Sequence, residues 1–286
     1  MRPIASDASW RIRGRDWTFA ERGMIMGVLN ITPDSFSDGG KFFDLDRAVE
    51  HGLRLLAEGA DILDVGGEST RPGASPVAVD EELRRVIPLI AKLRQATDAL
   101  ISVDTMKAEV AREAVRAGAD IINDVSGFRD PEMVAVAQQC EAALVVMHMQ
   151  GVPSTMQAAP HYDDVVAEVR AFFDEQLKRF AAASIVQERI AFDPGFCFGK
   201  TLEHNVALLN AIETLRGAGR PLVVGLSRKS LLGKLLGDTR MESRYWPNIA
   251  LTAWLRDAGV EVVRVHDVKA NAEALHMMDA IKGRAA

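Results

Sequence analysis

Eight short apolar runs, separated by longer amphipathic stretches, constrain the fold of this chain more than any other feature. The runs are rich in β-branched residues and lack polar alternation, as is typical of strands that are buried on both faces. They lie at residues 24–29, 61–65, 100–103, 120–123, 143–147, 190–192, 221–226 and 261–265. Strands that alternate with helices form a parallel sheet with right-handed crossovers. Eight such units predict an α/β fold of the (β/α)8 TIM-barrel type, although an open doubly wound sheet also fits the count.

The stretches between the runs carry the signals of helices and turns. From Val166 to Phe180 apolar residues recur at steps of three and four, which is the period of one helix face. Asp130 followed by Pro131 predicts a helix N-cap with proline at the first helical position. Residues 10–20 precede the first run and predict a hairpin, which in a barrel would close the N-terminal mouth. Because no linker-like segment interrupts the chain, we expect residues 1–286 to form a single domain with this short hairpin at the barrel bottom.

Charge and cysteine content exclude several classes of protein. The chain has 34 Lys and Arg residues against 40 Asp and Glu residues, and this net charge of −6 argues against nucleic acid as the main partner, because phosphate binding on that scale needs a basic face. Cys140 and Cys197 are too few for a disulfide framework. The apolar runs are shorter than a membrane-spanning helix, and residues 1–15 lack the apolar core of a signal peptide. We therefore expect a cytoplasmic protein with no membrane partner.

Polar or charged side chains follow every one of the eight runs. They are Asn30, then Glu68 to Arg71, Asp104, Asn123 with Asp124, His148, Asp193, Ser227 to Lys229, and Arg264 with His266 and Asp267. One such residue is explained by the preference of turns for Asn, Asp, Ser and Gly. Eight out of eight, with Lys, Arg and His among them, are better explained by one site, because the carboxyl ends of barrel strands meet on a single face.

The residue types at these ends indicate an anionic, nitrogen-rich ligand. Cationic donors that suit a phosphate group are supplied by Arg71, Arg228, Lys229, Arg264 and His266. Asp104, Asn123 and Asp193 can hydrogen-bond a flat heterocycle or face a developing positive charge. The chain lacks the H-E-x-x-H motif and the paired-cysteine spacing of zinc sites, so we expect any metal to be Mg²⁺ held partly by substrate phosphates.

Two loops rich in Gly, Pro and Ser, at residues 32–41 and 66–75, are long enough to close over such a site. The alternative is that both are ordinary surface loops. Phe36 favours the interpretation as lids, because an apolar ring in a polar loop needs a surface on which to pack.

Eight segments of the chain occur in the order found in one enzyme family. They are 26–40 (MGVLNITPDSFSDGG), 64–73 (DVGGESTRPG), 102–105 (SVDT), 122–125 (INDV), 147–151 (MHMQG), 193–195 (DPG), 225–230 (GLSRKS) and 264–270 (RVHDVKA). Through these segments the chain resembles the dihydropteroate synthases, the pterin-binding barrels of folate biosynthesis that sulfonamides target. The resemblance extends over nearly the whole chain, and eight motifs in register make it specific.

The resemblance implies a (β/α)8 barrel that acts as a transferase. The implied reaction joins 6-hydroxymethyl-7,8-dihydropterin diphosphate to para-aminobenzoate and releases pyrophosphate by an SN1-like mechanism. It also implies Mg²⁺ as the cofactor and a homodimer as the assembly.

The resemblance further implies a role for each matching site residue. The pterin would be bound by Asp104, Asn123, Asp193 and Lys229. The pyrophosphate would be bound by Asn30, Arg71, Arg264 and His266, with Asn30 as the protein ligand of Mg²⁺. Para-aminobenzoate would be enclosed by Phe36, Thr70, Arg71, Pro72, Phe198 and Ser230. The implied catalytic residues are Asp104, Asp193, Lys229, Arg264 and His266.

One residue departs from the family pattern, and two alternative functions stay open. Cys197 stands where the family pattern Asp-Pro-Gly-Phe-Gly-Phe-Gly-Lys has glycine. It is either a catalytic thiol or a small residue tolerated in place of glycine, and a positive φ would shift the loop around Phe198. The alternatives are a methyltetrahydrofolate–corrinoid methyltransferase, for which the phosphate-binding cations would be surplus, and a non-catalytic paralogue that binds a pterin or a phosphate.

Overall fold

The computed structural model describes residues 8–31, 41–71, 73–216, 218–238 and 240–283, with the side chains of 41–44 left aside. Within these ranges eight parallel strands form the central sheet. They are β3 (Met24–Asn30), β4 (Ile62–Gly66), β5 (Leu100–Asp104), β6 (Ile121–Asp124), β7 (Ala143–Met147), β8 (Ile190–Asp193), β9 (Val223–Gly225) and β10 (Val262–Val265). Each strand begins and ends within two residues of an expected apolar run, so the expected strands are confirmed.

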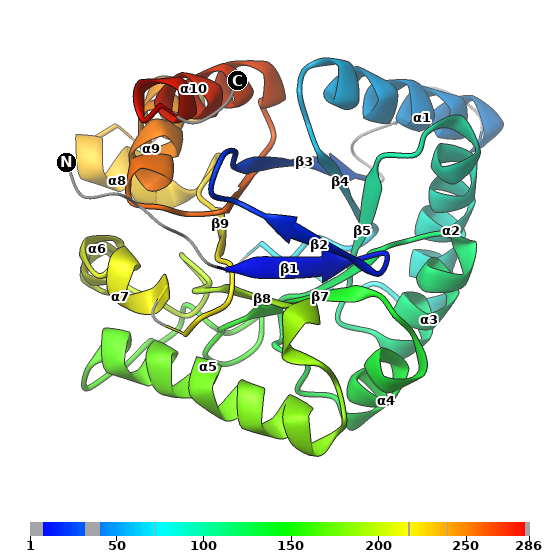
Figure 1. Ribbon diagram of the computed structural model, residues 1–286, viewed down its shortest axis with the longest axis horizontal. Coiled ribbons are helices and arrows are strands. Elements are labelled where there is room, and N and C mark those ends of the chain that lie inside the picture. Colours follow the sequence, from blue (N-terminus) through cyan, green and yellow to red (C-terminus); the bar gives the residue numbers. More distant parts are fainter. Residues whose placement is uncertain (1–7, 32–40, 72, 217, 239, 284–286) are drawn as a thin grey trace.

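Helices surround the sheet (Figure 1). In the described part of the chain they are α1 (Lys41–Ala57), α2 (Val79–Ala96), α3 (Ala108–Ala117), α4 (Pro131–Gln139), α5 (Val165–Ala182), α6 (Leu202–Asn210), α7 (Ile212–Arg216), α8 (Ser230–Leu236), α9 (Tyr245–Asp257) and α10 (Val268–Ile281), with 3₁₀ turns η2 (Gln187–Arg189) and η3 (Glu242–Arg244). The expected N-cap of α4 is present, because Asp130 Oδ1 accepts a hydrogen bond from the backbone amide of Glu132 at 2.9 Å. None of the described helices combines the length and the apolar composition that crossing a membrane requires.

The sheet closes into a barrel. Its strand order is β8-β7-β6-β5-β4-β3-β10-β9, and all neighbouring strands are parallel. A parallel bridge between Phe192 and Leu222 joins the two ends of this order, and the amide of Phe192 donates to the carbonyl of Pro221 at 2.9 Å. The closed barrel is therefore confirmed, and the open doubly wound sheet is excluded.

Side chains along each strand alternate between the barrel interior and the helix layer. In β5, Leu100 packs in the lower interior, whereas Ile101 and Val103 pack against the surrounding helices. The period of two places Ser102 and Asp104 on the same inward side as Leu100. Inward positions therefore change from apolar at the amino end to polar at the carboxyl end, and this change sets the position of the polar mouth.

The predicted hairpin closes the amino end of the barrel (Figure 1). It consists of β1 (Ser9–Ile12) and β2 (Arg15–Thr18), which pair antiparallel. The side chain of Trp10 is fully buried and packs with Phe19 against the inward residues of the lower barrel. Trp10 Nε1 also donates to the carbonyl of Arg189 at 2.9 Å. Because the hairpin covers this end of the barrel, a substrate enters from the opposite end.

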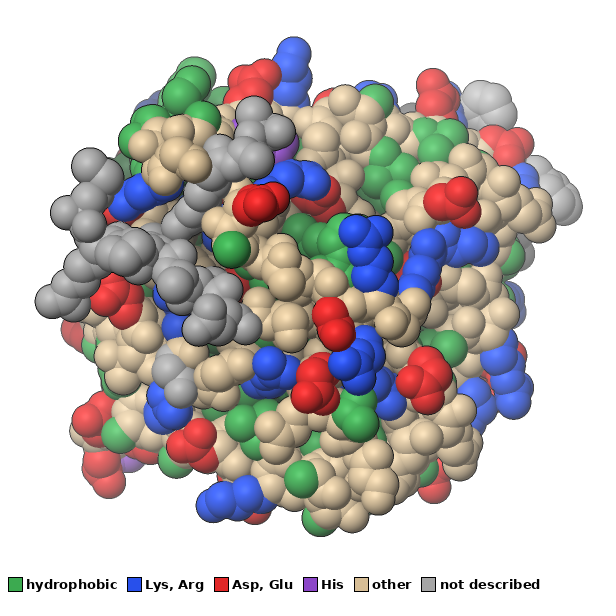
Figure 2. Space-filling model, in the orientation of Figure 1, with side chains coloured by type: hydrophobic (Ala, Val, Ile, Leu, Met, Phe, Trp, Pro, Cys, Tyr) green, Lys and Arg blue, Asp and Glu red, His purple; other side chains and the backbone are tan. Residues whose placement is uncertain are grey.

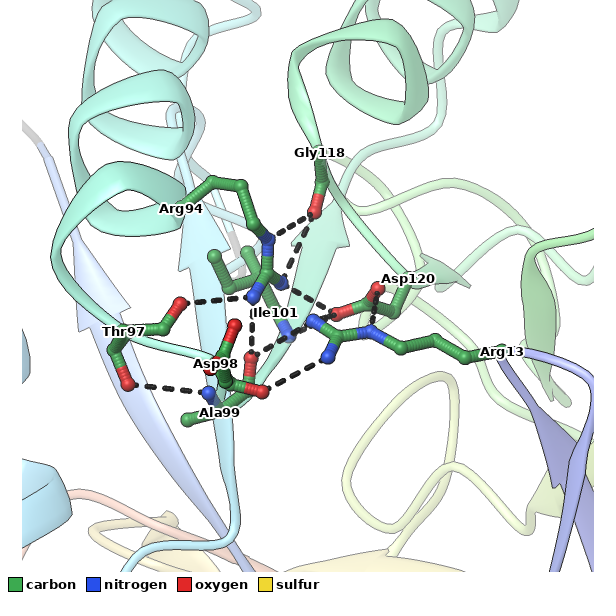
Figure 3. Close-up of polar contacts among 8 residues, drawn as sticks. All are labelled: Arg13, Arg94, Thr97, Asp98, Ala99, Ile101, Gly118 and Asp120. Atoms are coloured by element: carbon green, nitrogen blue, oxygen red, sulfur yellow. Dashed lines mark hydrogen bonds and ion pairs between the residues drawn. The ribbon is translucent and has the colours of Figure 1, made fainter.

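A polar network around Asp120 fixes the turn of the hairpin (Figure 3). Arg13 Nε and Nη2 donate to the two oxygens of Asp120 at 2.5 and 2.9 Å, and Arg94 Nη2 donates to the same carboxylate at 2.7 Å. The carboxylate also accepts the amide of Ile101 at 2.8 Å.

Figure 2 shows that basic and acidic side chains are interspersed over the described residues of this face.

Candidate active site

The carboxyl ends of the strands bring the predicted polar residues together. Asn30 ends β3, Asp104 ends β5 and Asp193 ends β8. Asn123 and Arg264 are the penultimate residues of β6 and β10, and Asp104 lies opposite Asn123 in the sheet register. Because parallel strands of a closed barrel all end on one face, these residues share a single mouth.

An ion-pair network forms the floor of this mouth. Arg264 Nε donates to Asp64 Oδ2 at 2.6 Å, and Arg264 Nη2 donates to Asp104 Oδ2 at 2.7 Å. Asn123 Nδ2 donates to the two oxygens of Asp64 at 3.2 and 3.3 Å. Asp104 Oδ1 is buried without a hydrogen-bond partner among the described residues. Since buried polar atoms are nearly always paired, this oxygen is available to an N–H group of a bound ligand.

Burial governs the charge of the two acids at the mouth. Removal from water raises the pKa of Asp104, and this effect exceeds the opposing attraction of Arg264. Burial likewise raises the pKa of Asp193, against the opposing attraction of Lys229. Burial therefore disfavours negative charge on either carboxylate unless a positively charged group lies beside it.

Lys229 contacts the loop of residues 194–200 that follows β8. Its Nζ donates to the carbonyl of Phe196 at 2.7 Å and lies 4.8 Å from the centroid of the Phe198 ring. At the start of this loop, Asp193 Oδ1 accepts the amide of Gly195 at 2.7 Å. Burial lowers the pKa of Lys229, an effect that the nearby Asp193 opposes. Lys229, Asp193 and the loop therefore form one unit beside the ion-pair network.

His266 is a hydrogen-bonding group in this mouth and not a cation. Its Nδ1 lies 3.1 Å from Ser227 Oγ, which also accepts the His266 backbone amide at 3.1 Å. Burial, together with the positive charges of Arg264, Arg228 and Arg71, lowers the pKa of His266 to about 3. The expectation that His266 supplies positive charge is therefore wrong at neutral pH.

The loop after β4 carries Thr70 and Arg71 and is fixed at its base by buried charges. Lys107 Nζ bridges the carboxylates of Glu68, in the loop, and Glu82, in α2. Thr70 is half-buried and Arg71 is exposed. These ion pairs fix only the base of the loop, and Arg71 lies farther along it, at the rim of the mouth.

The other residues expected around para-aminobenzoate have different surroundings. The half-buried ring of Phe198 packs on a group of methionine and valine side chains and faces Lys229. Ser230 is the exposed first residue of α8, directly after Lys229. Phe36 and Pro72 lie outside the described residues.

Asn30 and Gly66 form the part of the mouth that fits a small cation. A Cβ atom on Gly66 would lie 3.0 Å from Asn30 Oδ1, so glycine leaves that oxygen accessible. Within the described ranges, three or more His, Cys, Asp or Glu side chains are nowhere grouped so that they could hold a metal ion. These residues fit Mg²⁺ as an ion shared with substrate phosphates, since Mg²⁺ commonly keeps several waters and few protein ligands.

The expected site residues omitted three charged groups, of which Asp64 and Lys200 are buried and Lys107 is half-buried. Asp64 lies two residues before the end of β4, on the inward side. Because successive side chains of a strand point to opposite sides, its position within the run 61–65 is a signal that identifies it as inward-facing. Lys107 and Lys200 follow loops, where no periodicity indicates which side chains turn inward. Their burial depends on contacts with segments distant in the sequence.

Cys197 adopts a backbone conformation that favours glycine. Its φ is +66°, its amide donates to Asn205 Oδ1 at 2.7 Å, and its carbonyl accepts Gln157 Nε2 at 2.5 Å. A residue with a Cβ atom pays roughly 1–2 kcal/mol in this left-handed region. The loop therefore keeps a glycine-type backbone at a position where the chain has cysteine.

We expect Cys197→Gly to raise the free energy of unfolding by up to about 1 kcal/mol, because relief of the left-handed strain exceeds the added freedom of the unfolded chain. Cys197→Val should lower it, since a β-branched side chain tolerates positive φ least. Urea denaturation measures both changes. Turnover by Cys197→Gly should equal that of the wild type, whereas a complete loss of turnover would identify the thiol as catalytic.

Known proteins match the chain over almost its whole length. The profile of the family described as pterin binding enzyme covers residues 26–266. Dihydropteroate synthase from Escherichia coli (strain K12) is 47% identical over 256 residues, which cover 90% of each chain. The structure of Xanthomonas albilineans dihydropteroate synthase with 4-aminobenzoic acid has a TM-score of 0.88 at 46% identity, covering 96% of this chain and 98% of that one. The structure of the same enzyme with 7,8-dihydropteroate has a TM-score of 0.84 at 40% identity, covering 96% and 99%.

The closed barrel and the polar mouth at its carboxyl end, taken with the profile match, define a pterin-binding barrel enzyme. Relatives at this level of identity and coverage identify the family within this class of enzymes. The chain belongs to the dihydropteroate synthase family.

Proposed function

We propose that the chain catalyses the dihydropteroate synthase reaction of folate biosynthesis. In this reaction the pterinylmethyl group of 6-hydroxymethyl-7,8-dihydropterin diphosphate is transferred to the amino group of para-aminobenzoate, giving 7,8-dihydropteroate and pyrophosphate. The observation that carries the proposal is the buried network of Asp64, Arg264, Asp104 and Asn123, with its unpaired carboxylate oxygen. The X. albilineans relative has been solved with 4-aminobenzoic acid and with 7,8-dihydropteroate, which supports this choice of substrates.

The pterin is assigned to Asp104, Asn123, Asp193 and Lys229. In an SN1-like step the bond from the methylene carbon to the diphosphate oxygen breaks, and its electron pair leaves with pyrophosphate. Asp104 and Asp193 then face the cation that remains. A carboxylate about 4 Å from a unit charge contributes roughly 4 kcal/mol at an effective dielectric constant of 20, or on the order of 10³ in rate if it acts only in the transition state.

The leaving diphosphate is assigned to Asn30, Arg71, Arg264 and His266. Arg264 is oriented by Asp64 and Asp104, which leaves part of its guanidinium for phosphate oxygens. His266 contributes a hydrogen bond as a neutral ring. When bound, Mg²⁺ supplies positive charge to the diphosphate oxygens, and Asn30 is its proposed protein ligand.

Para-aminobenzoate is assigned to Phe36, Thr70, Arg71, Pro72, Phe198 and Ser230. Its neutral amine attacks the cation with the nitrogen lone pair, forms the new carbon–nitrogen bond and then loses a proton to solvent. Water would also react with the cation, so closure of residues 32–41 and 66–75 over the mouth protects the intermediate. The catalytic residues in this proposal are Asp104, Asp193, Lys229, Arg264 and His266.

We also propose that residues 1–286 act as a single domain within a cytoplasmic homodimer. Large exposed apolar side chains on α8, α9 and α10 and directly before η3 support a homodimer, because such surfaces commonly mark interfaces. They are Leu235, Leu236, Met241, Tyr245, Trp246, Trp254, Met277 and Ile281. The two cysteines are unpaired, in keeping with a reducing compartment.

We expect purified protein with Mg²⁺, the pterin diphosphate and para-aminobenzoate to release pyrophosphate in step with formation of 7,8-dihydropteroate. Removal of Mg²⁺ by EDTA should lower turnover by about 10² or more, and added Mg²⁺ should restore it. Pterin binding without release would instead indicate a non-catalytic paralogue. Methyl transfer from methyltetrahydrofolate to a corrinoid would support the methyltransferase alternative.

A further inference from the structure

A buried lysine lies inside the loop that follows β8. The side chain of Lys200 is 3% exposed, and within the described residues it forms no ion pair. Its Nζ donates to the carbonyls of Gly195 at 2.9 Å, Phe198 at 3.1 Å and His148 at 3.3 Å, and lies 3.0 Å from His148 Nδ1. All of its hydrogen-bonding capacity is therefore used on this loop and on the residue that follows β7.

The backbone of the loop is folded tightly around this ammonium group. Gly195, Cys197 and Gly199 have φ values of +67°, +66° and +61°, so every second residue is left-handed. A Cβ atom on Gly195 would collide with the carbonyl oxygen of His148. This conformation brings the loop carbonyls together on Lys200. Without the Lys200 donors the Phe198 carbonyl would lose its ammonium partner, and the Gly195 carbonyl would keep only the amide of Phe198, which donates to it at 3.1 Å.

The same loop also contacts Lys229. The carbonyl of Phe196 accepts a hydrogen bond from Lys229 Nζ, and the ring of Phe198 lies against the same ammonium group. The two lysines thus bind different carbonyls of one loop, Lys229 that of Phe196 and Lys200 those of Gly195 and Phe198.

We propose that Lys200 is a positioning residue for the arylamine substrate: by holding the carbonyls of Gly195 and Phe198, it fixes the Phe198 ring and the Phe196 carbonyl around Lys229. This proposal rests on the proposed function. Burial lowers the pKa of Lys200 to about 7, and the neighbouring Asp193 opposes this shift. The amine keeps at least two donors in either protonation state, so it can hold both carbonyls over the working pH range.

The chain offers a matched control at the other end of β8. Arg189, directly before this strand, is 4% exposed and donates to the carbonyls of Ala142 at 2.6 and 2.8 Å and of Ala137 at 2.9 Å. Like Lys200, it is a buried cation that binds backbone carbonyls. It lies at the end of the barrel covered by the hairpin, away from the mouth.

Steady-state kinetics of Lys200→Met and Arg189→Met, with para-aminobenzoate and the pterin diphosphate varied separately, test this role. Lys200→Met should raise the KM for para-aminobenzoate about tenfold or more, while the Kd for the pterin diphosphate stays within about threefold of the wild-type value. Arg189→Met should leave both constants near wild type, although both variants lower the melting temperature. Lys200→Gln, which keeps an amide donor on a shorter side chain, should give an intermediate KM.

An unchanged KM for para-aminobenzoate in Lys200→Met, or equal changes in both methionine variants, would overturn the positioning role. If Lys200→Met does not fold, a wild-type KM in Lys200→Gln would overturn it in the same way. Failure of the wild-type chain to release pyrophosphate is a separate outcome, and it counts against the proposed function itself.

Discussion

Lys229→Ala is expected to lower kcat/KM by about 10²–10³, with only a small loss of stability. The ammonium group lies at the mouth between the Phe196 carbonyl, the Phe198 ring and Asp193. Removing one charged donor aimed at a transition state typically costs about 3–4 kcal/mol, which corresponds to this change in rate. Folding should lose only about 1–2 kcal/mol, because the variant gives up one hydrogen bond but also relieves the burial of a cation.

Lys234→Ala is the control for this variant. Lys234 is exposed in the last turn of α8, so its removal makes the same change in net charge on the same helix without touching the mouth. Pyrophosphate release and thermal melting of both variants distinguish the two roles. If the melting temperature of Lys229→Ala falls steeply in parallel with its activity, Lys229 is structural and the assignment to the pterin pocket is wrong.

The barrel could be predicted because its signals are local. Each strand is an apolar run of three to seven residues, and the count of eight follows directly from the sequence. Closure of the sheet depends on the bridge between Phe192 and Leu222, which are 30 positions apart. No local pattern encodes that contact, so the open sheet could be excluded only by the structure.

Three of the expected runs begin one residue before the observed strand, and in each case that residue is acidic. Asp61, Asp120 and Glu261 each lie directly before a strand. Their carboxylates accept a backbone amide at the edge of the barrel, and the donors are Ile25 at 2.8 Å, Ile101 at 2.8 Å and Leu222 at 2.9 Å. At each of these positions a carboxylate accepts the amide hydrogen bond that a strand carbonyl would otherwise accept. From the sequence, an acidic residue at the start of an apolar run does not show whether its side chain or a backbone carbonyl accepts that hydrogen bond.

The position of the polar mouth could be predicted, but not its internal pairing. The strand ends indicated Asp104 and Arg264, yet the partner that orients Arg264 is Asp64, 200 residues away in the sequence. The charge of His266 could not be predicted either, because its pKa depends on burial, on the neighbouring Arg264 and on cations from two other segments. Residue types therefore indicated which chemistry meets at the mouth, whereas the protonation and orientation of each group depend on the tertiary fold.

Asp64→Asn is expected to lower the free energy of unfolding by about 3–5 kcal/mol and to weaken pterin binding. The Asp64 carboxylate is fully buried and accepts hydrogen bonds from both Arg264 and Asn123. Removing one partner of a buried ion pair costs about this much, and here Arg264 would keep only Asp104, whose pKa burial raises, as an anionic partner. An asparagine also turns an N–H donor toward one of the two existing donors. Asn123 and Arg264 therefore lose the orientation with which, in the proposed function, they meet the pterin and its diphosphate.

Asp267→Asn provides the comparison at the same mouth. Asp267 pairs with Arg228 at 2.9 Å, but both side chains are partly exposed to water, so this change should cost less than about 1 kcal/mol. Urea denaturation gives the stabilities, and calorimetric titration with the pterin diphosphate gives the affinities. The double variant Asp64→Asn with Arg264→Met should lose less stability than the sum of the single variants, because it removes both charges of the pair. Strictly additive losses would show that Asp64 and Arg264 act independently, and the floor of the pterin pocket would then need a different explanation.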